Sequence, residues 1–263
     1  MILAGRTVLL TGATGGLGHA IARRLRTAGA ELVVTGRRTE VLEPLAQETG
    51  ARALAVDLVD PEAVERLATE CADVDVLVAN AALPASGDFM SFSPEEIDRA
   101  LAVNLRAPMV LARLLGEGMA ERGHGHLVFI SSLAGKAASP GGAVYSATKF
   151  GLRGFAQGLR ADLRTRGVGV SVVFPGFIRD AGMFHESRAK LPKFVGTSTP
   201  EDVAEGVMRA IERNRAEVDV APLPLRAGAM AAGLAPELAA SAQRRLGGDD
   251  VAAALTAGQA SKR

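Results

Sequence analysis

Apolar runs rich in β-branched residues recur along this chain and alternate with stretches in which apolar residues follow helical spacing. Seven runs are predicted strands: Thr7–Leu10, Glu31–Thr35, Ala53–Val56, Val74–Val78, His126–Ile130, Val170–Phe174 and Glu217–Val220. Several are apolar at nearly every position, which is typical of parallel strands buried on both faces. The alternation therefore predicts an α/β fold, with a doubly wound seven-stranded parallel sheet and helices on both faces.

Helix-start signals support this alternation. Asp60-Pro61, Ser93-Pro94 and Thr199-Pro200 each place a capping residue before a proline that suits the first helical position. Glu96, three residues after Ser93, completes a capping box. The chain shows no linker, low-complexity tract or solenoid repeat, so we expect residues 1–263 to form a single domain.

Charge and apolar content exclude several classes of protein. The 30 lysines and arginines nearly balance 29 acids, so a basic surface for nucleic acid is not expected. The first ten residues lack the basic region of a signal peptide, and no apolar run approaches the roughly 18 residues of a membrane span. The single cysteine, Cys71, cannot form an internal disulfide. We expect a cytoplasmic protein that acts on a small molecule, without membrane contact.

A glycine-rich turn follows the first predicted strand and opens directly into a helical pattern. It reads Thr11-Gly12-Ala13-Thr14-Gly15-Gly16-Leu17-Gly18. Glycines allow a tight turn and let backbone N–H groups approach a pyrophosphate at the helix N-terminus. A Walker A loop is excluded because no Lys-Ser/Thr follows the last glycine. We predict a dinucleotide site that uses Gly12, Thr14, Gly16, Leu17 and Gly18, the alternative being a turn without a ligand.

The end of the second predicted strand bears on the choice of cofactor. In dinucleotide folds an acidic residue there binds the ribose hydroxyls, whereas an arginine accommodates a 2′-phosphate. This chain has Arg37 and Arg38 and no acid at that point. The pair is also compatible with a solvated surface turn. The position of the arginines and the absence of an acidic residue together favour NADP over NAD. Arg37 is the stronger candidate for the residue that binds the 2′-phosphate.

Three polar residues form a candidate catalytic group. Tyr145 and Lys149 are four residues apart and would share one face of a helix. A nearby cation stabilises phenolate and is expected to lower the pKa of the tyrosine, the only one in the chain. Ser132 follows the fifth predicted strand, at the edge where open α/β sheets carry their sites. Two histidines, His124 and His126, lack a third ligand nearby, so no metal site is expected.

With these residues in place, the sequence resembles the classical short-chain dehydrogenase/reductase family. The resemblance spans residues 7 to about 180 and lies in the order and spacing of a set of motifs. They are Thr11-Gly12-x-x-x-Gly16-x-Gly18, Asp57-Leu58, Asn80-Ala81-Ala82, Asn104, Ser132, Tyr145-x-x-x-Lys149 and Pro175-Gly176. Each motif alone is weak, whereas the ordered set is specific.

The resemblance implies a single Rossmann-fold domain that exchanges hydride between a nicotinamide and a carbonyl/alcohol pair. Tyr145 would donate or take the proton, Ser132 would hydrogen-bond the substrate oxygen, and Lys149 would also hold the nicotinamide ribose. Asp57 and Leu58 would flank the adenine. The remaining implied cofactor contacts are Asn80 at the end of the fourth strand, Pro175, and the backbone of Ile178.

Asn104 would hold a water in a proton relay, and the sequence adds a physical reason. Pro108 falls inside the helix that Ser93 opens, and its missing N–H would leave the carbonyl of Asn104, four residues earlier, unpaired. We hypothesise that this opened turn lets the Asn104 carbonyl bind the relay water.

Two positions depart from the family pattern. Ala82 stands where a glycine is frequent after the fourth strand. Asp180 stands where a threonine commonly bonds the nicotinamide carboxamide, and an ionised carboxylate can accept from that amide but cannot donate.

The sequence leaves several alternatives open. A catalytically silent NADP-binding sensor or scaffold of the same fold competes with the enzyme, and an epimerase or dehydratase is a third possibility. The resemblance implies a homodimer or a homotetramer, a substrate loop at about residues 181–198, and a C-terminal helix and tail at about residues 222–263. That helix would cap the substrate pocket or pack against another subunit, in preference to a membrane surface. The substrate itself cannot be read from the residues.

Overall fold

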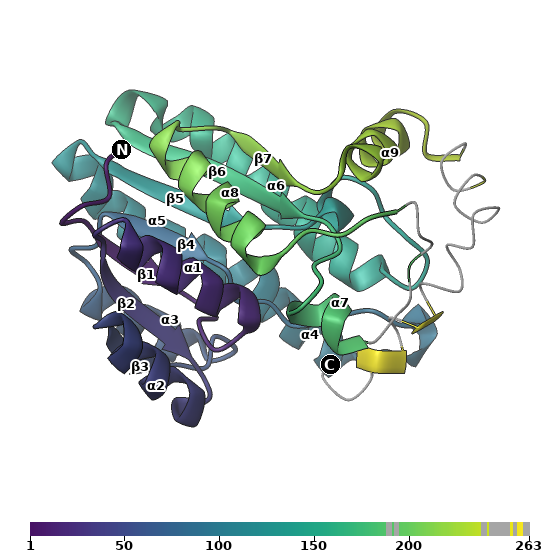
Figure 1. The fold of residues 1–263 in the computed structure, drawn as a ribbon, viewed down its shortest axis with the longest axis horizontal. Helices are drawn as coiled ribbons and strands as arrows, with labels where there is room; N and C mark the ends of the chain where they lie inside the picture. The colour runs from purple at the N-terminus through teal and green to yellow at the C-terminus, as the bar shows by residue number, and fades with distance from the viewer. Residues whose placement is uncertain (188–190, 192–194, 238–240, 242–252, 255–256, 260–263) are drawn as a thin grey trace.

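The computed structural model describes residues 1–187, 191, 195–237, 241, 253–254 and 257–259, and it confirms the predicted α/β fold (Figure 1). Seven parallel strands form one sheet in the order β3-β2-β1-β4-β5-β6-β7. The strands are β1 (Thr7–Leu10), β2 (Glu31–Gly36), β3 (Arg52–Ala55), β4 (Val76–Ala79), β5 (Gly125–Ile130), β6 (Val168–Pro175) and β7 (Glu217–Val220). This is the doubly wound order, in which the sequence of strands reverses between β1 and β4.

Helices cover both faces of the sheet (Figure 1). On one face pack α1 (Gly16–Thr27), α2 (Thr39–Thr49) and α8 (Pro200–Glu212). On the other pack α3 (Pro61–Glu70), α5 (Ala107–Arg122) and α6 (Ala143–Leu163). Three more lie toward the edge of the sheet where the strands end: α4 (Pro94–Leu101), α7 (Gly182–Ser187) and α9 (Leu223–Leu234).

Alternate residues of each strand enter the two apolar layers, as the pleat of a strand requires. In β1, Val8 and Leu10 pack with α1 and α8, whereas Leu9 packs with α3 and α5. In β5, Leu127 and Phe129 join the second layer. Because both faces are buried, these strands read as continuous apolar runs in the sequence.

The predicted helix starts are confirmed. The Asp60 side chain accepts a hydrogen bond from Glu62 N at 2.9 Å at the start of α3. Ser93 and Glu96 form the reciprocal capping box of α4. Thr199 forms a second box at α8, in which Asp202 takes the place that glutamate or glutamine usually holds.

Most strand ends differ from the sequence prediction by one or two residues. Gly125 and Gly169, which resemble turn residues in the sequence, are paired inside β5 and β6. A side chain on Gly169 would collide with the imidazole of His126, so the glycine is what permits this close strand contact. His126 is buried on β5, where its Nε2 lies 2.8 Å from Ser171 Oγ.

Within the described part of the chain, no helix is both long and apolar enough to cross a membrane.

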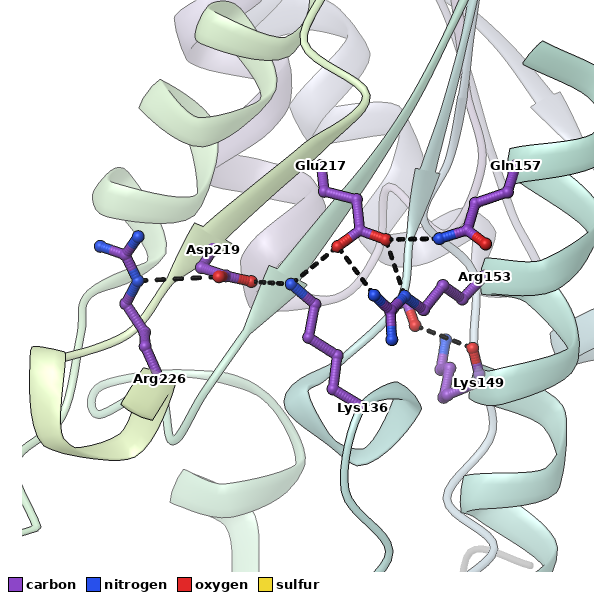
Figure 2. A network of polar contacts seen from close by, with 8 residues as sticks. Lys136, Lys149, Arg153, Gln157, Glu217, Asp219 and Arg226 are labelled. Carbon is purple, nitrogen blue, oxygen red and sulfur yellow. Dashed lines mark hydrogen bonds and ion pairs between the residues drawn. The ribbon is translucent and has the colours of Figure 1, made fainter. Parts of the chain in front are cut away.

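A partly buried ion-pair network joins the last strand to the rest of the fold (Figure 2). At its centre is Lys136, which follows the short 3₁₀ turn η3 (Leu133–Gly135). Its Nζ lies 2.6 Å from Asp219 Oδ1 and 2.9 Å from Glu217 Oε2, both on β7. The same ammonium lies 4.1 Å from the centroid of the Phe174 ring. The cation is therefore enclosed by two carboxylates and an aromatic face.

The two carboxylates also bind other elements (Figure 2). Glu217 accepts hydrogen bonds from Arg153 Nε at 2.7 Å and Gln157 Nε2 at 2.9 Å, both on α6. Asp219 lies 3.7 Å from Arg226 Nε on α9. The network thus fixes β7 relative to α6, α9 and the segment after β5.

We expect Lys136→Met to lower the free energy of unfolding by about 3 kcal/mol, because it leaves two largely buried carboxylates short of a partner. Arg66→Met is the control: it removes a partner of Asp60 and Glu62 at an exposed surface pair, where we expect less than about 1 kcal/mol. Urea unfolding with an unchanged slope measures both differences. Equal effects of the two substitutions would contradict the central role of Lys136.

Candidate active site

The carboxyl ends of the central strands surround one cavity of about 1160 Å³. Every residue that the sequence nominates for the site lines it, apart from Asn104. These are Gly12, Thr14, Gly16, Leu17, Gly18, Arg37, Arg38, Asp57, Leu58, Asn80, Ser132, Tyr145, Lys149, Pro175 and Ile178. Residues from seven segments of the chain therefore meet at one edge of the sheet.

The glycine turn lies directly against the end of β4. Gly12 has φ +66°, and a Cβ placed on it would lie 2.6 Å from the Cα of Ala81. A Cβ on Gly18 would collide with the carbonyl of Gly12. Gly15 caps α1 without a side-chain hydrogen bond, so the first N–H groups of that helix remain directed at the cavity. The turn therefore forms a backbone cradle of the kind that binds a pyrophosphate.

Thr11 and Asn80 hold this cradle in place. Thr11 Oγ1 accepts hydrogen bonds from Asn80 N and Ala81 N, each at 3.1 Å. The Asn80 side chain donates in return to the carbonyls of Thr11, at 3.1 Å, and Gly12, at 3.0 Å. Asn80 thus lies beside the cavity, and its amide is used to join β1 to β4.

The two arginines at the end of β2 have different surroundings. Arg38 Nη2 donates to the carbonyl of Thr14 at 2.6 Å and so supports the glycine turn. Arg37 Nη1 lies 3.9 Å from Asp57 Oδ2, and both side chains are half exposed. Such a loose exposed pair holds the guanidinium weakly. Arg37 is therefore the arginine that is available to a ligand phosphate.

Helix α6 presents Tyr145 and Lys149 to the cavity on one face. Lys149 Nζ lies 5.6 Å from the centroid of the Tyr145 ring and donates to the carbonyl of Ile130 at 2.9 Å. Ser132 starts the η3 turn, where its Oγ accepts from Ala134 N at 3.2 Å. The Ser132 Oγ also lies 3.5 Å from the carbonyl oxygen of Pro175, and the nearby Ser132 hydroxyl acts to lower the pKa of the Tyr145 phenol. Serine, tyrosine and lysine therefore line the same cavity.

Burial disfavours the charged form of each ionisable group, so it shifts the pKa values of Tyr145 and Lys149 in opposite directions. It raises the pKa of Tyr145 to about 12, although the nearby Ser132 hydroxyl acts in the opposite direction. It lowers the pKa of Lys149 to about 8. The expected lowering of the tyrosine pKa by Lys149 is not found: burial dominates, and Ser132 is the neighbour that acts against it. Tyr145 packs against the buried side chains of Ala85, Ala100 and Val144, which contribute to this burial.

Asn104 lies behind the cavity and is fully buried. Its Oδ1 accepts from Leu83 N at 2.7 Å, and its Nδ2 donates to the Leu83 carbonyl at 2.9 Å. The side chain thus fixes the segment that follows β4. Around it the helix widens into a π turn over Ala102–Arg106, immediately before Pro108. The turn is opened as the proline predicts, and the water at the Asn104 carbonyl stays a prediction.

Asp180 does not take the place of the family's threonine. It adopts a left-handed backbone conformation with φ +71°, and its carboxylate, 67% exposed, pairs with Arg179 at 3.5 Å outside the cavity lining. Ile178 lines the cavity and pairs with Ser198 in an isolated bridge. That bridge uses the backbone of Phe177 and Arg179, so the backbone groups of Ile178 remain for a ligand.

The structure adds lining residues that sequence reasoning missed. Gln259, from the C-terminal segment, donates to the carbonyl of Met183 at 3.3 Å, and its buried Oε1 has no hydrogen-bond partner among the described residues. Arg99 of α4 also lines the cavity. No local signal marks these two residues, because each reaches the site through tertiary packing. One face of α9 lines the cavity as well, which is one of the two placements that the sequence left open for this helix. Parts of the expected substrate loop and tail, namely 188–190, 192–194, 238–240, 242–252, 255–256 and 260–263, lie outside the described residues.

We expect the phenol of Tyr145 to titrate above its ordinary pKa of 10.0, toward about 12. At about pH 11 such a group is roughly one-tenth ionised in the folded protein, whereas an ordinary phenol is about nine-tenths ionised. Phenolate absorbance measures this cleanly because the chain has one tyrosine. Circular dichroism at the same pH checks that the protein is folded. A midpoint at or below 10 in folded protein would contradict the effect of burial.

Comparison with known proteins agrees with this geometry. The family model of the short chain dehydrogenases matches residues 6–192. A ketoacyl reductase, HetN, of Nostoc sp. is 39% identical over 232 residues, which are 85% of this chain and 81% of that protein. A 3-oxoacyl-acyl-carrier-protein reductase, FabG, of Rickettsia conorii is 34% identical over 215 residues, which are 78% of this chain and 88% of that protein.

Among solved structures, a metagenomic short-chain oxidoreductase in complex with NADP superimposes with a TM-score of 0.70 at 33% identity. The match covers 84% of this chain and 99% of that one. The motif order, the sheet and the matched length together place this chain in the short-chain dehydrogenase/reductase family of oxidoreductases.

Proposed function

We propose that the protein is an NADP(H)-dependent oxidoreductase that acts on a carbonyl or a secondary alcohol, with Tyr145 as the acid and base. One observation carries the proposal: Ser132, Tyr145 and Lys149 line the same cavity as the glycine cradle, with Lys149 Nζ 5.6 Å from the centroid of the Tyr145 ring. Ser132 and Tyr145 can contact a substrate oxygen in this cavity, and Lys149 lies one helical turn from Tyr145.

The residues present fit a nicotinamide dinucleotide. The glycine cradle and the N-terminus of α1 suit the pyrophosphate. Arg37 suits a 2′-phosphate, and Asp57 and Leu58 line the region where the adenine would lie. Lys149 and the backbone of Ile178 would hold the nicotinamide end. When bound, the nicotinamide supplies or accepts the hydride.

The protein's own residues move and hold the proton. Ser132 would donate a hydrogen bond to the substrate oxygen and so orient the carbon toward the cofactor. With a pKa of about 12, the Tyr145 phenol is protonated at neutral pH and ready to donate its proton to a developing alkoxide. In the oxidative direction the phenolate is the reactive form, so the oxidative rate should rise with pH. Lys149, whose Nζ lies 5.6 Å from the centroid of the Tyr145 ring, would stabilise that phenolate.

We expect Tyr145→Phe to lower kcat by about 10²- to 10⁴-fold because the proton donor is lost. NADPH affinity should stay within about twofold, since the ring remains. NADPH absorbance over a panel of aldehydes and ketones measures turnover, and NADPH fluorescence measures binding. Binding without turnover by the wild type across the panel would instead favour a silent NADP-binding sensor. An unchanged rate in Tyr145→Phe would remove the tyrosine from the mechanism.

We expect Arg37→Ala to weaken NADPH binding by about ten- to hundredfold and NADH binding very little, because a charge-assisted contact to the 2′-phosphate is lost. Arg38→Ala is the matched control. It removes the bond to the Thr14 carbonyl, which supports the turn for either cofactor, so both affinities should fall alike. Fluorescence titration gives the dissociation constants of NADPH and NADH for the wild type and for both variants. Tighter binding of NADH than NADPH by the wild type would overturn the NADP preference.

The resemblance also supports a cytoplasmic homodimer or homotetramer, which we include in the proposal. Light scattering at several protein concentrations would give the assembly.

A further inference from the structure

The cavity continues beyond the catalytic group into a chamber with apolar walls. One wall comes from the segment after β5, and another comes from the segment that runs from the end of β6 into α7. The apolar lining residues of these two walls are Leu133, Ala134, Ala137, Ala138, Phe177, Met183 and Phe184. The substrate side of the site is therefore walled mainly by hydrocarbon.

Helix α9 closes the chamber with one of its faces. Leu225, Gly228, Ala229 and Ala232 line the cavity, and their spacing places them on a single face of the helix. The opposite face carries Ala227 and the strongly exposed Leu223, Met230 and Leu234. The inner face thus bears one large side chain and three small residues.

The small residues determine how deep the chamber is at this wall. Gly228 is exposed, and a Cβ placed on it would meet no atom of the described residues within 4 Å. Leu225, in contrast, seats the helix on the end of β6, because its Cδ1 would lie 3.6 Å from a Cβ on Gly176. The helix therefore stands close to the sheet at Leu225 and leaves space at Gly228, where a larger residue would reduce the room.

The ion-pair network contacts α9 through one pair, between Arg226 and Asp219 (Figure 2). Arg226, the one charged residue within α9, pairs with Asp219, which also binds Lys136. Lys136 follows Ser132 by four residues, and its carbonyl would lie 3.7 Å from a Cβ on Gly233. The charge of α9 is thus directed at β7 and not into the chamber. The wall is fixed relative to the serine that would orient the substrate.

Charged side chains that line the cavity lie elsewhere. Arg37, Arg38 and Asp57 belong to the cofactor half, and Lys149 belongs to the catalytic group. Among the described residues, the charged ones that line the substrate side are Arg99 of α4 and the exposed Glu186 of α7, and each has a partner. The α9 wall itself offers no ionic group to a substrate.

We infer that the inner face of α9 is a specificity-determining wall, and that the substrate is a ketone or secondary alcohol with an extended apolar substituent lying against Gly228, Ala229 and Ala232. The inference rests on the proposed oxidoreductase function and names its substrate class. Each methylene that enters the chamber should raise kcat/KM by about fourfold until the wall is reached.

The test compares two identical substitutions on opposite faces of one helix. Ala232→Phe would fill the chamber, whereas Ala227→Phe adds the same side chain on the solvent side. Butan-2-one, octan-2-one and dodecan-2-one serve as substrates with NADPH. Binding of dodecan-2-one to the NADPH-loaded protein is also measured by calorimetry, and the unfolding midpoint of each variant confirms its fold.

We expect the wild type and Ala227→Phe to prefer the longer ketones, and Ala232→Phe to lose about tenfold or more on dodecan-2-one while butan-2-one changes little. No preference for chain length, or equal effects of the two substitutions, would overturn the inference. Absence of turnover with every ketone would instead overturn the proposed function. In that case calorimetry tests whether the inner face of α9 is a binding wall. Binding of dodecan-2-one that is abolished by Ala232→Phe and retained by Ala227→Phe supports the inference, and any other result overturns it.

Discussion

The approach of Gly12 to Ala81 sets the geometry on which the rest of the site depends. A Cβ at Gly12 would lie 2.6 Å from the backbone of Ala81, so no other residue allows β1 and β4 to end this close together. Four hydrogen bonds that involve Thr11 and Asn80 hold the ends of β1 and β4 in this arrangement. The cradle, the start of α1 and the point where the strand order reverses then coincide, and the cavity opens there.

Burial gives the catalytic group its chemical character. A phenol and an ammonium one turn apart on α6 are both enclosed, so each pKa moves toward the neutral form. Ser132 is the polar neighbour that counters this effect on the phenol. A tyrosine that keeps its proton at neutral pH suits a donor in reduction. The same burial makes the phenolate, which oxidation requires, the less populated form.

Local signals predicted the fold, the glycine turn and the spacing of Tyr145 and Lys149, whereas the family resemblance supplied the remaining site residues. Strands buried on both faces appear as apolar runs, and Asp60, Ser93 and Thr199 mark helix starts by chemistry that acts within three residues. Tyr145 and Lys149 are related by helical spacing, and Pro108 indicated the opened turn at Asn104.

Contacts between distant segments could not be predicted in this way. Lys136 meets Glu217 and Asp219 across more than eighty residues. Asp180 turns its carboxylate away because its backbone is left-handed, which the residue type alone does not indicate. The pKa of Tyr145 depends on how closely apolar side chains pack around it. The place of α9 over the cavity depends on one ion pair and one leucine.

The ion-pair network also has a consequence for how the sheet is completed. Glu217 and Asp219 alternate along β7 with Val218 and Val220, which pack in the opposite layer with α8. A slip of β7 by one residue would bury both carboxylates among the side chains of α8 and offer two valines to Lys136. The last strand, at the edge of the sheet, therefore has only one register in which its carboxylates meet cations while its valines pack in the apolar layer.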